Sequence, residues 1–335
     1  MSTDSSLFPM PPVIETDAGR TRRVGVELEF TGLDIDRISA LVAEHCGGQV
    51  QRSSAYEHRI SGDPRGDWGV ELDFAYLKNK GRAHRDPDAA VEALEDVAEQ
   101  LVRLGAEQIV PFEVVSPPIP MNELSAMGPL IARLRDAGAR GTTDGLMYAF
   151  GMQLNPEVPA GDTQTLRRYL QSFLCLYDWL QARENVDFTR RLTAFAAPFS
   201  RDYVRRVVDP DYAPDLAALI DDYLAGNPTR NRPLDLLPLF LHLDPPRVRR
   251  VVDDPRVKPR PAFHYRLPNC EIDRPEWGVD QAWRGWLQVE HLAARPKRLH
   301  DLCGAYAAFL DRPLSGFLDD WKEQIREWLI PESDL

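Results

Sequence analysis

The clearest pattern in the chain is an alternation of apolar and acidic residues near its N-terminus. From Val24 to Phe30 the apolar side chains take every second position, and Gly25, Glu27 and Glu29 lie between them. A period of two is typical of a β-strand, so one face is apolar and the other carries two glutamates. Glutamate is disfavoured in sheets, and residues on one face lie about 7 Å apart along a strand. The two carboxylates therefore either face water or share a cation.

A second segment repeats this arrangement. Residues 67–77 alternate in the same way, which places Glu71 and Asp73 together on the face opposite the apolar side chains. The turn that follows contains Lys78 and Lys80, which could contact phosphate groups. An exposed lysine loop is the simpler interpretation of that turn, and a water-exposed acid is the simpler interpretation of Glu71.

Later segments add polar residues to further predicted strands. Predicted strands over 108–116, 146–155 and 262–269 carry, in chain order, Glu113, then Gln153 and Asn155, then His264 and Arg266. Helical spacing predicts helices between these strands, over 86–105, 122–137 and most of 162–255, and again from 279 to 329. A loop inside the long helical tract carries Arg230 and Arg232, which are further candidates for phosphate contacts.

Composition narrows the class of protein. Acidic residues outnumber basic ones by 52 to 40, and the net charge of −12 disfavours a nucleic-acid partner, because binding to the phosphate backbone needs a basic surface. No stretch approaches the about 20 apolar residues of a membrane span, and the start of the chain lacks the pattern of a signal peptide. Four cysteines without C-x-x-C spacing indicate reduced thiols. We therefore expect a cytoplasmic protein with no membrane partner.

The order of these polar segments resembles the amidoligase family, within the superfamily of glutamate-cysteine ligases and glutamine synthetases. The resemblance covers about residues 22–275 and rests on five pieces in the right order: Gly25-Val26-Glu27-Leu28-Glu29, Leu72-Asp73, Glu113-Val114-Val115-Ser116-Pro117, Gly151-Met152-Gln153-Leu154-Asn155 and His264-Tyr265-Arg266. Two residues differ from the family pattern: Gln153 stands where histidine is usual, and His264 stands where related ligases often carry glutamate. Both changes weaken the expected ligand set.

The resemblance implies an α+β fold with a curved, mostly antiparallel sheet and outer helices, as in the catalytic fold of glutamine synthetase. We expect one catalytic domain over 21–335 that follows a flexible arm at 1–20. Within it we place a helical insertion at about 160–258 and C-terminal helices at 279–330. An oligomer remains possible.

The resemblance also implies an ATP-dependent ligase that forms an amide bond between a carboxylate and an amine through an acyl phosphate, with glutamate or a glutamyl group as the carboxylate. Two or three Mg²⁺ ions would bind at Glu27, Glu29, Glu113, Asp73 and Gln153. Arg266 would stabilise the transferring phosphoryl group, and Glu71 would act as general base. Asn155, Lys78, Lys80, Arg230, Arg232 and His264 would contact the nucleotide or the substrates.

Two other functions stay open on the sequence alone. A metal-dependent hydrolase could use the same acidic residues without a nucleotide. A non-catalytic binding protein would follow if Gln153 and His264 record the loss of a metal site. The partners of either ligase or hydrolase would be small molecules.

Overall fold

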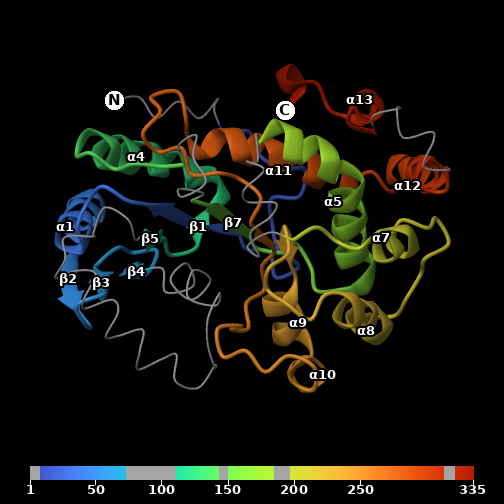
Figure 1. Cartoon of the computed structure of the whole chain (residues 1–335), viewed down its shortest axis with the longest axis horizontal. Coiled ribbons are helices and arrows are strands. Elements are labelled where there is room, and N and C mark those ends of the chain that lie inside the picture. Colours follow the sequence, from blue (N-terminus) through green and yellow to red (C-terminus); the bar gives the residue numbers. More distant parts are fainter. Residues whose placement is uncertain (1–7, 73–110, 143–149, 185–196, 313–320) are drawn as a thin grey trace, which may run out of the picture.

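The computed structural model of the chain describes residues 8–72, 111–142, 150–184, 197–312 and 321–335. Within these ranges the strands form one nine-stranded sheet in which every pairing between named strands is antiparallel. The strand order is β2-β3-β4-β5-β1-β7-β9-β8, with β6 paired to β1. The predicted α+β class and antiparallel sheet are therefore confirmed (Figure 1). The strands are β1 (Arg23–Phe30), β2 (Gln49–Arg52), β3 (Glu57–Ser61), β4 (Trp68–Leu72), β5 (Phe112–Val115), β6 (Ile119–Pro120), β7 (Met152–Pro156), β8 (Leu234–Asp235) and β9 (His264–Tyr265).

Helices lie on both sides of this sheet. In Figure 1, α4 and α11 lie above the central strands, whereas α9 and α10 lie below them. None of the helices described is both long and apolar enough to cross a bilayer. The helices are α1 (Ile35–Cys46), η4 (Met121–Ala126), α4 (Met127–Asp136), α5 (Thr163–Arg183), α7 (Arg201–Val207), α8 (Leu216–Gly226), α9 (Leu237–Leu243), α10 (Pro245–Arg249), α11 (Val279–Ala293), α12 (Pro296–Leu310), α13 (Trp321–Gln324), η6 (Ile325–Trp328) and η7 (Glu332–Asp334).

One face of the sheet is the main hydrophobic core. The alternation in β1 buries Val26 and Leu28 completely, and Leu154 of β7 lies on the same face. Helix α1 packs against β3 and β4 at one end of the sheet. At the other end, Phe173 of α5 and Trp286 of α11 pack around a tyrosine of β9, with ring centroids 6.0 and 5.5 Å away. Each such buried side chain contributes about 1.5–3 kcal/mol relative to an exposed one.

The opposite face of the sheet is polar, and its register brings acidic residues together. Glu71 of β4 lies opposite Glu113 of β5, and Glu113 lies opposite Glu29 of β1. Glu27, two residues before Glu29 on β1, lies opposite Gln153 of β7. Because residues directly opposite each other in an antiparallel pair share a face, these five side chains point to the same side. The pairing therefore gathers the acidic residues that the period-two pattern placed on separate strands.

The predicted helix over 122–137 is divided in the structure. Its first part is the 3₁₀ helix η4, and the α-helix α4 begins only at Met127. Pro129 lies in the first turn of α4, where its missing N–H costs nothing. A single α-helix through this point would lose the hydrogen bond from Pro129 to Ser125, so the boundary follows from the proline.

The described part of the predicted N-terminal arm contacts the body of the protein. Trp283 of α11 donates its indole N–H to the carbonyl of Pro9 at 2.8 Å, and the N–H of Asp17 donates to the carbonyl of Pro159 at 2.8 Å. Helices α5 to α10 occupy the predicted helical insertion, interrupted by β8. The division of the chain into an arm, a body and an insertion stays a prediction.

A buried ion pair joins the start of β1 to α11. The guanidinium of Arg22 donates to both oxygens of Glu290, at 2.8 and 3.0 Å, and both side chains are fully buried. The hydroxyl of Tyr169 and the indole N–H of Trp286 also donate to this carboxylate. Four hydrogen-bond donors therefore satisfy the buried carboxylate of Glu290, which is the condition under which a buried ion pair is tolerated.

Candidate active site

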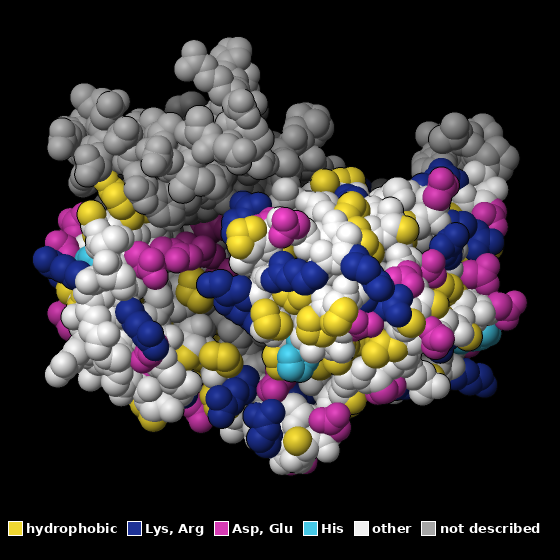
Figure 2. Space-filling model, turned by 90° about the horizontal axis from the view of Figure 1, so that it is seen from below, with side chains coloured by type: hydrophobic (Ala, Val, Ile, Leu, Met, Phe, Trp, Pro, Cys, Tyr) yellow, Lys and Arg dark blue, Asp and Glu magenta, His cyan; other side chains and the backbone are white. Residues whose placement is uncertain are grey.

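A cavity of about 600 Å³ lies over the polar face of the sheet. One wall is acidic and comes from three neighbouring strands: Glu27, Glu71 and Glu113. The facing wall is basic and comes from the loops before β8 and β9: Arg230, Arg256, Lys258 and Arg260. Figure 2 views the molecule from the side opposite α4 and α11 and shows acidic side chains in a hollow beside lysine and arginine side chains. Such a pairing of walls suits a ligand that combines phosphate groups with a cation.

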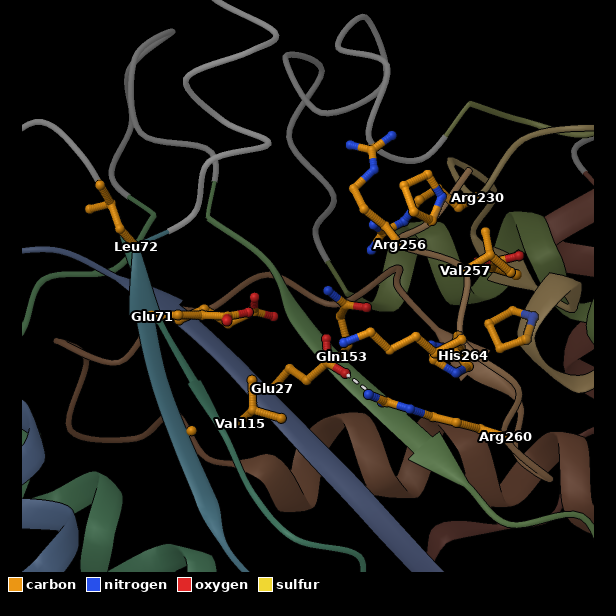
Figure 3. Close-up of a pocket in the computed structure, with 16 residues that line it drawn as sticks. Glu27, Glu71, Leu72, Val115, Gln153, Arg230, Arg256, Val257, Arg260 and His264 are labelled. Atoms are coloured by element: carbon orange, nitrogen blue, oxygen red, sulfur yellow. Dashed lines mark ion pairs between the residues drawn. The ribbon is translucent and has the colours of Figure 1, made fainter. Parts of the chain in front are cut away.

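Glu27 of the acidic wall contacts residues of the neighbouring strands and of the basic wall. Its side chain is only 12% exposed, and its Oε1 accepts a hydrogen bond from Asn155 Nδ2 at 2.6 Å. The Arg260 guanidinium faces the same oxygen at 3.7 Å, as the dashed line in Figure 3 shows. The carboxyl groups of Glu27 and Glu113 are also hydrogen-bonded to each other. Glu27 therefore links the strands, the basic wall and the second acid.

The surroundings of Glu27 favour its ionised form. Burial alone would raise the pKa of Glu27, but the charge of His264, when its imidazole is protonated, and the hydrogen bond with the Glu113 carboxyl group oppose burial. The guanidinium groups of Arg266 and Arg260 act in the same direction, and the net result is a lowered pKa. Glu27 is therefore a carboxylate at neutral pH, and it is available to a cation.

His264 is held neutral beside this carboxylate. It is 7% exposed, and its Nε2 has no hydrogen-bond partner in the described part of the chain. Burial lowers the pKa of His264 to about 3, although Glu27 acts in the opposite direction. Arg260, Arg266 and Arg230 lower it further. A neutral imidazole in this position can accept or donate a hydrogen bond to a ligand without adding charge.

This low pKa predicts a pH dependence of stability. The unfolded chain protonates His264 near pH 6.5, whereas the folded chain does so only near pH 3. The contribution of neutral His264 to the free energy of unfolding is complete above pH 6.5. It falls as the pH decreases from 6.5 towards 3, by up to about 1.4 kcal/mol per pH unit. We expect urea unfolding of His264→Gln to show a weaker loss of stability on acidification than the wild type. His300→Gln, at an exposed position, is the control, and equal slopes in His264→Gln and wild type would contradict the expectation.

Asp235 is an acidic residue of the cavity that the sequence pattern did not indicate. It lies on β8 opposite His264, is 2% exposed, and accepts the N–H of Leu237 at 2.9 Å. Burial raises the pKa of Asp235 to about 6, although the positive charge of Arg266 opposes this. A strand of two residues has no detectable alternation, so only the fold brings Asp235 to the site.

Three basic residues of the cavity were also not predicted from the sequence: Arg256, Lys258 and Arg260. They lie on the loop 255–261, in which prolines and basic residues are interleaved. Proline fixes φ and restricts a loop in the unfolded chain as well as in the folded one. The alternation of proline with arginine or lysine is the signal that could have indicated a rigid basic wall here.

Some predicted site residues lie near the cavity without lining it. Glu29 points to the same side of the sheet, but its Oε2 accepts the N–H of Gly151 at 2.7 Å, and it is not among the lining residues. Arg266 is 8% exposed and is not among the lining residues, but its charge acts on Glu27 and Asp235.

Arg232 does not line the cavity. Its guanidinium donates to the carbonyls of Ala197, Pro198 and Gly226, at 3.2, 2.6 and 3.1 Å, and it lies over the ring of Phe199. These contacts hold the loop before β8 and leave Arg232 outside the cavity, whereas Arg230, two residues earlier, lines it. Asp73, Lys78 and Lys80 lie outside the described residues.

The donor atoms of the cavity fit a hard divalent cation. Gln153 Oε1 is buried and has no hydrogen-bond partner among the residues described. It lies on the strand next to Glu27, whose carboxyl group contacts that of Glu113. Two carboxyl groups in contact must share a proton or a cation, and Mg²⁺ prefers oxygen ligands of this kind. In the described ranges no three Asp, Glu, His or Cys side chains gather closely enough to hold a metal ion by themselves. If two carboxylates and an amide oxygen bound the metal ion, its other coordination positions would be left to water and phosphate.

The antiparallel sheet and the cavity with facing acidic and basic walls define an α+β protein with a candidate site for an anionic ligand and a cation. The family described as "Putative amidoligase enzyme" matches residues 20–288, and the chain belongs to this family. The resemblance noted from the sequence is confirmed. Neither a curated protein nor a solved structure matches the chain significantly.

Proposed function

We propose that the chain is an ATP- and Mg²⁺-dependent carboxylate–amine ligase. The observation that carries this proposal is a cavity with carboxylates from three adjacent strands on one wall and four basic side chains on the other. Joining a carboxylate to an amine in water requires activation, and the approach of a carboxylate to a polyphosphate is opposed by charge. The two walls supply what this reaction needs, because one attracts cations and the other attracts phosphates.

In this proposal Arg230, Arg256 and Lys258 bind the phosphates of ATP, and Glu27, Glu113 and Gln153 hold Mg²⁺. The bound metal would act as a Lewis acid on phosphate oxygens and hold them in place. Arginine suits phosphate because its planar donors match two oxygens at once. The charge of Arg266 contributes to keeping Glu27 ionised.

The reaction would run in two steps. An oxygen of the substrate carboxylate attacks the γ-phosphorus, the bond to the bridging oxygen breaks, and ADP leaves. The amine then gives up a proton, forms a bond to the acyl carbon, and expels phosphate with the electrons of the carbon–oxygen bond. Glu71, an exposed carboxylate at the rim of the acidic wall, is the proposed acceptor of that proton. We propose a glutamyl-type carboxylate as the acyl substrate, by analogy within the superfamily.

The test is release of ADP by the full chain in the presence of ATP, Mg²⁺, pooled carboxylates and pooled amines. We expect ADP release that needs both a carboxylate and an amine, and calorimetric binding of ATP only when Mg²⁺ is present. Absence of ATP binding at millimolar nucleotide would overturn the proposal. Bond cleavage that proceeds without nucleotide would instead support a metal-dependent hydrolase.

A further inference from the structure

Arg260 contacts the carboxylate on which the proposed metal site depends. Its Nη1 lies 3.7 Å from Oε1 of Glu27, and in Figure 3 its guanidinium points to that carboxylate. Glu27 lies opposite Gln153 in the sheet, and these two side chains supply two of the three proposed metal ligands. A positive side chain therefore lies beside the position where a metal ion is expected. A divalent cation bound at Glu27 would be repelled by this charge.

The backbone around Arg260 is fixed on two sides. The N–H of Arg260 donates to the carbonyl of Pro238 in α9 at 3.0 Å, and the carbonyl of Pro261 accepts from the N–H of Val158 at 2.9 Å. Pro259 precedes Arg260 and restricts the loop further, because the proline ring fixes φ. The loop therefore holds the Cα atom of Arg260 in place beside the cavity.

The side chain of Arg260 has more freedom than its backbone. It is 46% exposed, whereas the side chain of Glu27 is 12% exposed. Exposed side chains change rotamer within nanoseconds, and an ion pair that water reaches is weak. Arg260 also lines the cavity beside Arg256 and Lys258, two of the proposed phosphate contacts. It can therefore exchange the Glu27 carboxylate for another anion in the cavity without a movement of the backbone.

We propose that Arg260 is a positioning residue that couples the binding of the metal ion to the binding of the nucleotide. In the free chain its guanidinium pairs with Glu27 and opposes the binding of a divalent cation. When ATP is bound, the guanidinium turns to the phosphates, whose oxygens match its planar donors, and leaves Glu27 to the metal ion. Each ligand then binds more tightly in the presence of the other. This assignment rests on the proposed ligase function.

The first test is calorimetric titration of the full chain with Mn²⁺ in the absence of nucleotide. Mn²⁺ takes carboxylate and carbonyl oxygens as ligands, as Mg²⁺ does. We expect Arg260→Gln to bind Mn²⁺ about three- to tenfold more tightly than the wild type, because the positive charge beside the site is lost. Arg260→Lys keeps that charge, so its affinity for Mn²⁺ should match that of the wild type.

The second measurement is the affinity for ATP at saturating Mg²⁺, which Arg260→Gln should weaken by about three- to tenfold. A purely structural role of Arg260 would not change the two affinities in opposite directions. Arg256→Gln is the matched control, because it removes the same charge from the same loop, where Arg256 pairs with Asp254 at 2.7 Å. It should weaken ATP binding but change the affinity for Mn²⁺ less than Arg260→Gln does.

The outcomes separate this inference from the ligase proposal. An affinity for Mn²⁺ that Arg260→Gln leaves unchanged or lowers overturns the inference, even if ATP binds with Mg²⁺. Tighter Mn²⁺ binding that persists when Glu27 is also replaced by glutamine overturns it too, because the metal ion is then bound elsewhere. Tighter binding that depends on Glu27, in a chain that does not bind ATP, supports the competition of Arg260 with the metal ion and overturns the ligase function. Thermal unfolding of Arg260→Gln should match the wild type, because this side chain is exposed.

Discussion

We expect the Glu27→Gln variant to lose ADP-forming activity by about a hundredfold or more. Glutamine keeps the size of the side chain and can still accept the hydrogen bond from Asn155. It removes the negative charge that faces Arg260 and contacts Glu113, and with it the carboxylate proposed to hold Mg²⁺. Initial rates of ADP release at saturating ATP and Mg²⁺ measure the loss.

Two comparisons make this result specific. Glu44→Gln removes a carboxylate of α1 that is 62% exposed and outside the cavity, so its activity should equal that of the wild type. Glu29→Gln should have a smaller effect than Glu27→Gln, because Glu29 bonds to the Gly151 N–H and does not line the cavity. A Glu27→Gln enzyme that is folded and fully active would show that this carboxylate has no part in the reaction.

The largest effect on stability should come from Glu290→Ala, which we expect to lower the free energy of unfolding by about 3–5 kcal/mol. The change leaves the fully buried guanidinium of Arg22 without its carboxylate partner, and it removes the acceptor for Tyr169 and Trp286. Denaturation by urea, followed by tryptophan fluorescence and by circular dichroism, measures the difference.

The matched control is Glu332→Ala, which removes a carboxylate that pairs with Arg183 at 2.6 Å but is 59% exposed. Water and salt screen such a pair, so its loss should change stability far less than the loss of Glu290. If the two variants unfold at the same urea concentration, the buried network does not contribute to stability as the structure indicates.

The sequence predicts the central strands well because their period of two reflects burial on one face. β1 and β7 appear where the alternation of apolar and polar residues places them. The hairpin of β2 and β3 was not predicted. All four residues of β2 are exposed, so no apolar face marks it as a strand.

The candidate site was predictable only where its residues lie on long strands. Glu27, Glu113 and Gln153 follow from strand periodicity and family resemblance, and the register then brings them together. Arg260 and Asp235 come from a loop and from a two-residue strand, where no repeating pattern exists. Their place at the cavity depends on long-range packing, which local periodicity does not encode.

The adjacent residues Arg22 and Arg23 point to opposite sides of β1, and this has a consequence for how the strand is aligned. Arg22 has its carboxylate partner only inside the protein, at Glu290, whereas Arg23 lies exposed on the polar side. A shift of β1 by one residue would exchange the two faces of the strand. The buried carboxylate of Glu290 would then lose its partner, and Glu27 would point into the hydrophobic interior. The ion pair between Arg22 and Glu290 therefore favours one register of β1. Loss of this ion pair should therefore disorder the acidic wall of the cavity, even though Glu290 lies on the other side of the sheet.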